Sequence, residues 1–201
     1  MLNDHPTVPA KTMMNKSKKE SLLQAAKDLF GECGYVETTF KKISDRAGVA
    51  LGLLTHHYGN KEKLFLACGL DVLEHFLKRL RQATAEADSG FDGVMRFCKA
   101  YLDFSIDKDS NWLVLVRCSP YSDMKTKTDR DIMDSMFSQV HQELEKVIVR
   151  GIEDGSLVTV DSNSTAQVII SLMVGANRTR VLTPYAMPSL YKDVLDFVAR
   201  S

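Results

Sequence analysis

Several residues between positions 39 and 61 have side chains of the kinds that recognise nucleic acid. Hydroxyl and imidazole groups can hydrogen-bond the edges of bases, and lysines can contact phosphates. Thr55 can also touch a thymine methyl group, and Lys61 stands at the start of an expected helix, where negative charge is favoured. Together, the candidate DNA contacts are Thr39, Lys42, Leu51, Gly52, Leu53, Thr55, His56, His57, Tyr58 and Lys61.

Two short helices joined by a tight turn are expected to position these side chains. The first has apolar residues at helical spacing, namely Phe40, Ile43 and Ala47. Thr38 or Thr39 can cap it, and Gly48 lies where a helix commonly ends in a left-handed residue. The second ends at Gly59, and Asn60 can cap the helix that follows. Two short helices with such a turn place the second one in the DNA major groove.

A longer helix is expected just upstream. Ser17 and Glu20 have the spacing of a capping box, in which the two side chains satisfy each other's backbone amides. The apolar face of this helix consists of Leu22, Ala26, Leu29, Phe30 and Cys33, and Gly34 closes it.

The order of these landmarks resembles the N-terminal domain of TetR-family transcriptional regulators. The matching residues are Ala25-Ala26, Leu29-Phe30, Gly34-Tyr35, Thr39, Ile43, Ala47-Gly48-Val49, Gly52, His57-Tyr58, Lys61 and Leu64. Residues 53–58 are similar to the betaine/choline-type branch, which often has a small hydroxyl residue where most members have Tyr. Two departures affect which DNA sequence would be read: most relatives have Ser or Thr at the position of Ala50, and often Lys or Arg at that of Leu51.

The composition predicts an all-α protein with a basic N-terminal part. The chain has 201 residues, 44% of them hydrophobic, only five prolines, and no apolar run long enough for a membrane span. Residues 11–63 contain ten Lys/Arg against six Asp/Glu, so the rest carries sixteen against twenty. A basic end on an acidic body suits contact with phosphates at one end only, although four charges is a small excess.

Enzyme, metal and cofactor sites are not expected. The sequence has no G-x-S-x-G, no glycine-rich phosphate loop and no H-E-x-x-H motif. The cysteines Cys33, Cys68, Cys98 and Cys118 lack metal-like spacing and are interpreted as reduced thiols of a cytoplasmic protein, with a redox pair of Cys98 and Cys118 as the alternative. Adjacent His56 and His57 point apart on a helix and cannot chelate one ion together.

The expected organisation is a mobile extension at 1–15, a helix-turn-helix domain at 16–63, and a helical regulatory and dimerisation domain at 64–201. Met1, Met13 and Met14 are all possible starts. In the larger domain we predict helices at 60–84 and 91–107, and a short one at 112–118, where the periodicity alone also permits a strand.

Two functions are predicted for the larger domain. Met and aromatic residues with a few polar groups can form a ligand pocket, although they equally suit a filled core. The pocket candidates are Cys98, Tyr101, Trp112, Arg117, Tyr121, Met136, Phe137, Met173 and Asn177. The seam 133–147 and the mostly apolar segment 165–182 suit a two-fold interface or a monomer core, and the interface candidates are Phe137, Val140, Leu144, Ile169 and Met173.

The resemblance implies a homodimeric transcriptional regulator that binds a palindromic double-stranded operator. Most often such a protein is a repressor that a small molecule releases from DNA, and the sparse polar groups favour a largely hydrophobic effector. One alternative is a helical interaction module that has lost DNA binding. A ligand-independent regulator or an activator is another.

Overall fold

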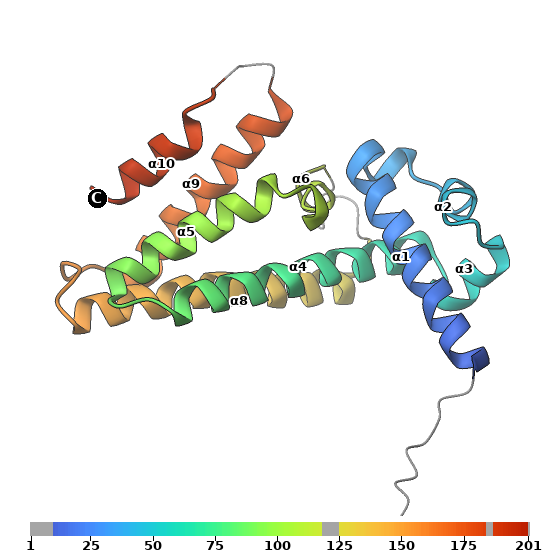
Figure 1. Cartoon of the computed structure of the whole chain (residues 1–201), viewed down its shortest axis with the longest axis horizontal. Helices are drawn as coiled ribbons and strands as arrows, with labels where there is room; N and C mark the ends of the chain where they lie inside the picture. The colour runs from blue at the N-terminus through green and yellow to red at the C-terminus, as the bar shows by residue number, and fades with distance from the viewer. Residues whose placement is uncertain (1–9, 118–124, 184–186, 201) are drawn as a thin grey trace, which may run out of the picture.

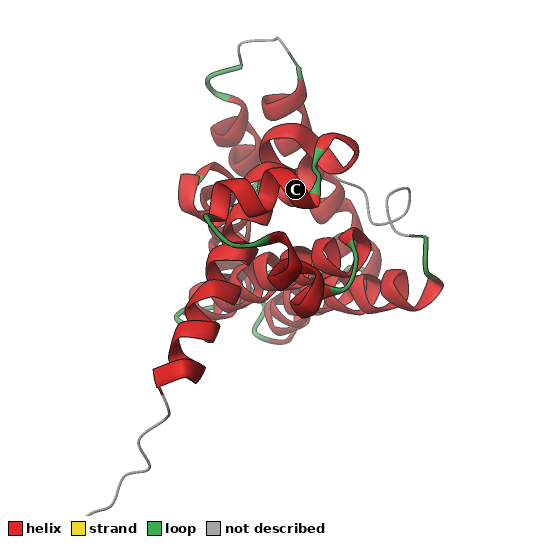
Figure 2. Cartoon of the chain, turned by 90° about the vertical axis from the view of Figure 1, so that its right-hand side faces the viewer, coloured by secondary structure: helices red, strands yellow, loops and turns green. Residues whose placement is uncertain are grey.

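The chain folds into helices throughout the part that the structure describes. This computed structural model describes residues 10–117, 125–183 and 187–200, with side chains from residue 17 onward, and these residues contain no strand, as Figure 2 shows. The all-α prediction is therefore confirmed. The N-terminal helices are α1 (Ala10–Glu37), α2 (Phe40–Ala47) and α3 (Leu51–Tyr58).

The remaining helices form an elongated body. They are α4 (Lys61–Ala85), α5 (Gly90–Ile106), the 3-10 turn η1 (Lys108–Ser110), α6 (Leu113–Arg117), α8 (Lys127–Glu153), α9 (Ser162–Leu182) and α10 (Leu190–Val198). Helices α1–α3 form a head at one end, and α4 and α8 run side by side away from it (Figure 1). Helices α9 and α10 pack as a pair against α5.

The predicted ends of the short helices are confirmed. The Thr39 hydroxyl accepts a hydrogen bond from the Lys42 amide at 3.2 Å and caps α2, and Gly48 ends that helix with a left-handed φ of 63°. Asn60 caps α4 by accepting from the Lys63 amide at 2.9 Å. Local chemistry therefore determines where each of these helices begins or ends.

The predicted start of the first helix is wrong. Helix α1 already begins at Ala10, so Ser17 lies inside it, and the Ser17 carbonyl accepts a hydrogen bond from the Ser21 hydroxyl at 2.9 Å. The capping-box spacing of Ser17 and Glu20 therefore occurs within a helix. No glycine or proline occurs between residues 10 and 20 to interrupt it. The other end agrees with the prediction, because Gly34 has a non-helical φ of 77° and ψ of 179°.

The seam at 133–147 belongs to the core of the single chain. Met133 and Leu144 are fully buried, and Val140 and Val147 are at most 7% exposed. A Cβ added to Gly69 of α4 would lie 2.9 Å from the Met133 Cε atom, and one added to Gly93 of α5 would lie 3.0 Å from Val147. Helix α8 therefore turns this seam towards α4 and α5. Heptad-like spacing predicts that a helix packs against another helix, but it does not say to which chain the second helix belongs.

None of the described helices is both long and apolar enough to pass through a membrane.

The closest backbone approach at a glycine of the described body is between the start of α5 and the end of α8. A Cβ built on Gly90 would lie 2.0 Å from the Gly151 nitrogen and 2.1 Å from its Cα atom. We expect Gly90→Ala to lower the free energy of unfolding by at least about 1–3 kcal/mol, because α5 and α8 must move apart. Denaturant unfolding measures this loss.

Gly52→Ala is the matched control. Gly52 lies within α3 with nothing within 4 Å of an added Cβ, so the substitution should leave stability unchanged or raise it. An equal loss in the two variants would contradict the assignment of a close contact to Gly90.

Candidate nucleic-acid interface and ligand cavity

Helix α3 presents one continuous exposed face. Leu51, Gly52, Thr55 and His56 are exposed and follow one another at helical spacing, whereas Leu54 is fully buried on the opposite side. The Thr55 hydroxyl donates only a long, 3.4 Å bond to the Leu51 carbonyl. This face therefore offers hydroxyl, imidazole and apolar groups to a partner, and Gly52 leaves the backbone uncovered there.

Three of the other candidates on α3 turn away from this face. Leu53, His57 and Tyr58 are half-buried. The Tyr58 hydroxyl donates to the Lys19 carbonyl of α1 at 3.2 Å, and burial raises the pKa of Tyr58 to about 12. The Nε2 atom of His57 is buried without a hydrogen-bond partner among the described residues. Leu53, His57 and Tyr58 therefore lie beside the exposed face rather than on it, and their role as DNA contacts stays a prediction.

The ammonium group of Lys61 makes contacts within the chain that differ from the predicted phosphate contact. Its Nζ atom donates to the carbonyls of Tyr35 at 2.9 Å, Val36 at 3.4 Å and Thr38 at 3.1 Å, and it lies 4.4 Å from the centre of the Tyr35 ring. Because an ammonium group has three donors, no hydrogen remains for a phosphate. The carbonyls at the end of α1 lack helical partners, and Lys61 satisfies them.

Thr39 and Lys42 remain exposed beside α3. The Thr39 hydroxyl is used as the cap of α2, and the Lys42 Nζ atom donates to the Glu37 carbonyl at 2.7 Å. The lysine keeps further donors and is exposed to solvent. The exposed candidates of the head are therefore Thr39, Lys42, Leu51, Gly52, Thr55 and His56.

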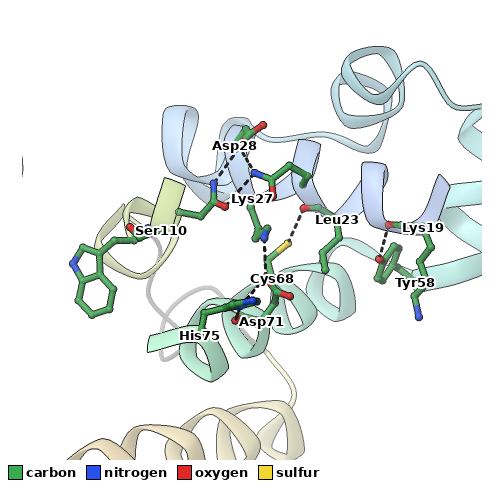
Figure 3. A network of polar contacts seen from close by, with 12 residues as sticks. Lys19, Leu23, Lys27, Asp28, Tyr58, Cys68, Asp71, His75 and Ser110 are labelled. Carbon is green, nitrogen blue, oxygen red and sulfur yellow. Dashed lines mark hydrogen bonds and ion pairs between the residues drawn. The ribbon is translucent and has the colours of Figure 1, made fainter. Parts of the chain in front are cut away.

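Polar contacts connect the head to the body along α1. The Lys27 ammonium pairs with the Asp71 carboxylate of α4 at 2.7 Å, and the Asp28 carboxylate accepts from the Asn111 amide at 3.1 Å (Figure 3). The Arg117 guanidinium donates to the Glu32 carbonyl at 3.0 Å. These contacts join residues far apart in the chain, and no sequence motif marks them.

A second connection joins the start of α4 to the start of α8. The Lys63 ammonium lies 2.6 Å from the Asp129 carboxylate, which is fully buried. The Glu62 carboxylate accepts from the Thr126 amide at 2.7 Å, and this bond lowers the pKa of Glu62. Only two residues separate the end of α3 from the start of α4, so this connection ties α8 to the end of α4 that adjoins the head.

A cavity of about 400 Å³, open to solvent on its α9 side, lies between α4, α5, α8 and α9. Three predicted pocket residues line it, namely Tyr101, Trp112 and Phe137, together with Phe76. Its polar groups come from His141, Gln167 and Ser171. The volume is within the range of cavities that hold small ligands.

The other pocket candidates do not line this cavity. Cys98 and Met173 are fully buried in the core, and burial raises the pKa of the Cys98 thiol to about 12. Asn177 accepts from the Tyr191 hydroxyl, and Arg117 binds the α1 carbonyl described above. Met136 accepts from the Gln139 amide on its own helix. Tyr121 lies outside the described residues. Side-chain type therefore predicted the aromatic residues that line the cavity, but it did not predict which candidate side chains point into it.

The interface candidates also need correction. Val140, Leu144 and Met173 are covered by the chain's own helices, so a second subunit has no surface to contact there. Phe137 is half-buried and lines the cavity, and Ile169 is half-buried beside an apolar groove of about 360 Å³. Exposed apolar side chains instead occur along α9, α10 and their connections, with Val168 65% and Phe197 60% exposed.

Within the described part of the chain, no three His, Cys, Asp or Glu side chains come together in a way that could hold a metal ion.

Comparison with known proteins agrees with this geometry. A model of the family described as bacterial regulatory proteins, tetR family, matches residues 22–68. The Transposon Tn10 TetC protein of Escherichia coli is 30% identical over 108 residues, which cover 52% of this chain and 53% of TetC. The HTH-type transcriptional repressor AcnR of Corynebacterium efficiens is 31% identical over 80 residues, covering 40% and 39% of the two chains. The chain thus spans about half the length of these relatives, or less.

The likeness in fold extends over nearly the whole chain. The crystal structure of the transcriptional regulator FadR from Bacillus subtilis, in complex with stearoyl-CoA, matches with a TM-score of 0.75 and 19% identity. The match covers 90% of this chain and 97% of that protein. The chain therefore has the fold of that regulator, at a low sequence identity.

The role of Lys61 can be tested by Lys61→Met, which keeps the aliphatic stem. We expect the free energy of unfolding to fall by about 1–3 kcal/mol, because carbonyls at the end of α1 lose their donor. The matched control is Lys41→Met, whose side chain is 80% exposed and should matter little. A salt dependence of DNA binding reduced by about one charge, without any loss of stability, would instead assign Lys61 to a phosphate.

Proposed function

We propose that this chain is a DNA-binding transcriptional regulator, because residues 22–68 match the tetR family of bacterial regulatory proteins. The observation that carries the proposal is the exposed face of α3, formed by Leu51, Gly52, Thr55 and His56. A helix presented in this way can enter the major groove, where side chains reach the edges of bases. Thr39 and Lys42 are the nearby groups for phosphates.

The regulator is proposed to act in the cytoplasm as a homodimer on a palindromic operator. A two-fold protein presents two identical heads to two half-sites, so that each α3 reads one of them. The exposed apolar side chains of α9 and α10, such as Val168 and Phe197, are the surface that we assign to the second subunit. A patch of apolar side chains that is exposed in a single chain commonly marks a surface that a partner covers in the assembly.

We further propose that the protein is a repressor which a small molecule releases from DNA. The cavity bounded by Tyr101, Trp112 and Phe137 is the proposed effector site. Helix α4 borders this cavity through Phe76 and begins directly after α3, so a change in its position changes the spacing of the two heads. A ligand achieves this only if it binds the DNA-incompetent conformation more tightly. AcnR is named as a repressor, and FadR was solved with an acyl-CoA, which supports this class of function.

DNA recognition by α3 is tested with Thr55→Val, which removes the hydroxyl group and keeps the shape. Binding to DNA from upstream of the protein's own gene should weaken about threefold to tenfold, as expected for one lost hydrogen bond. The salt dependence should stay unchanged, because no phosphate contact is lost. Electrophoretic or fluorescence titration at several salt concentrations measures both quantities.

Thr84→Val is the matched control for this substitution. The Thr84 hydroxyl donates to the Leu80 carbonyl at 3.1 Å, as the Thr55 hydroxyl does to Leu51, but at the far end of α4. DNA affinity should be unaffected. If the native protein has no affinity for DNA at any salt concentration, the proposed function is wrong and an interaction module is favoured.

Assembly is tested with Val168→Glu, which places a charge on the proposed two-fold surface of α9. An unpaired charge buried in an interface is strongly unfavourable, so the dimer should dissociate at micromolar concentration. Sedimentation should show a monomer for this variant and a dimer for the native protein. Ile132→Glu, at a 39% exposed position on α8, should remain dimeric. A native protein that sediments as a monomer would contradict the assignment.

A further inference from the structure

Trp112 separates two hollows in the molecule. It lines the cavity of about 400 Å³ in the body, and it also lines a cleft of about 380 Å³ between α1, the connection from α5 to α6, and the end of α9. Its ring is held by Phe76 and Tyr101, with ring centres 4.9 Å and 5.5 Å away. The Trp112 side chain therefore lines both the proposed effector site and the cleft beside α1.

The indole N–H of Trp112 has no hydrogen-bond acceptor in the part of the chain that the structure describes. The Nε1 atom is nevertheless buried, and the residue as a whole is 6% exposed. A buried tryptophan normally finds a partner for this donor, and leaving a buried donor unpaired is unfavourable. A state that supplies an acceptor is stabilised relative to the present one.

The remaining wall of the cavity determines what kind of molecule can supply that acceptor. Among the described residues that line it, none is a Lys, Arg, Asp or Glu. Its polar groups belong to His141, Gln167 and Ser171, and the other lining residues are aromatic or aliphatic. A charged ligand would find no permanently charged group among these residues to replace the hydration that it loses. A flat, uncharged molecule suits the aromatic walls.

We propose that the effector is an uncharged, ring-bearing compound with a carbonyl or ether oxygen, and that Trp112 recognises this oxygen through its indole N–H. This inference rests on the proposed function of the cavity as the effector site. Because the Nε1 atom is covered in the present conformation, the ring must turn to reach the ligand. The same ring also lines the cleft beside α1, so a movement of the ring changes the surroundings of α1 in the head.

The contacts of the residues next to Trp112 can carry a movement of its ring to α1 of the head. Its backbone amide donates to the Ser110 hydroxyl at 3.1 Å, and the next residue, Leu113, packs closely on α1. A Cβ added to Gly31 would lie 3.1 Å from the Leu113 Cβ atom, so α6 has little free space against α1. A shift of α6 therefore displaces α1 or breaks this contact.

Two aromatic compounds of nearly equal size test the chemistry. One is 2-acetylnaphthalene, which has a carbonyl, and the other is 2-isopropylnaphthalene, which has none. Calorimetry on the full-length protein should show the ketone binding about threefold to tenfold more tightly. In Trp112→Phe this preference should disappear while the hydrocarbon still binds. Phe137→Leu, which alters another wall, should weaken both compounds and keep the preference.

Trp112 is the only tryptophan of the chain, so its indole N–H gives a single side-chain resonance in nitrogen-15 NMR spectra. The ketone should move this resonance in the direction of a stronger hydrogen bond, and the hydrocarbon should not. Failure of both compounds to bind, equal affinity of the two, or a preference that persists in Trp112→Phe would overturn the proposal.

Release from DNA tests the transmission separately. The ketone should weaken binding of the native protein to DNA from upstream of its own gene. Trp112→Phe should bind this DNA but respond much less to saturating ketone. An undiminished response would overturn the role of Trp112 in transmission. If the native protein did not bind DNA at all, the proposed function would fail, whereas calorimetry and NMR would still decide the ligand chemistry.

Discussion

The short connection between α3 and α4 is the constraint on which the rest of the molecule depends. Only Gly59 and Asn60 separate the two helices, and Asn60 is fixed as the cap of α4. The direction of the exposed α3 face is therefore coupled to the axis of a helix of 25 residues, which is roughly 38 Å long. Because α4 is long, a small tilt of its axis within the body displaces α3 at its end by a larger distance.

Two further sets of contacts keep that coupling stiff. The start of α4 is held to α8 by the buried Asp129 carboxylate. Helix α1 is held to α4 through Lys27 and to the connection before α6 through Asn111. Both α4 and α8 also border the cavity. Two of the helices that border the cavity are therefore also helices that hold the head, which is why we propose that a ligand there acts on the orientation of the head.

Local chemistry made the helices and their ends predictable from sequence. The Thr39 and Asn60 caps and the left-handed Gly48 depend on residues within four positions of one another, and all three are as expected. The exposed and buried sides of α3 follow from helical periodicity, but the periodicity did not reveal that Tyr58 reaches back to α1. Ser17 was misread because a capping-box spacing also arises inside a helix.

Long-range contacts explain the remaining differences. Lys61 is basic and stands at a helix start, so sequence alone favours a phosphate. In the folded chain, two carbonyls at the end of α1 and the carbonyl of Thr38 just beyond it accept from its ammonium group. Val140 and Leu144 have the spacing of a helix seam, and only the folded chain shows that α4 and α5 already cover it. The similarity of residues 53–58 to the betaine/choline-type branch stays a prediction, since nothing in the fold depends on it.

The internal use of Lys61 has a consequence for how the protein would find its operator in a cell. With that ammonium group committed to carbonyls, Lys61 adds no free cation to the surface beside α3, where the exposed Lys42 is the remaining candidate for a phosphate. Attraction to arbitrary DNA comes almost entirely from such charges, and the chromosome offers an enormous excess of wrong sites. Compared with a head in which Lys61 contacted phosphate, this one would spend less time on unrelated sequences and would depend more on the fit of α3 to its own half-site.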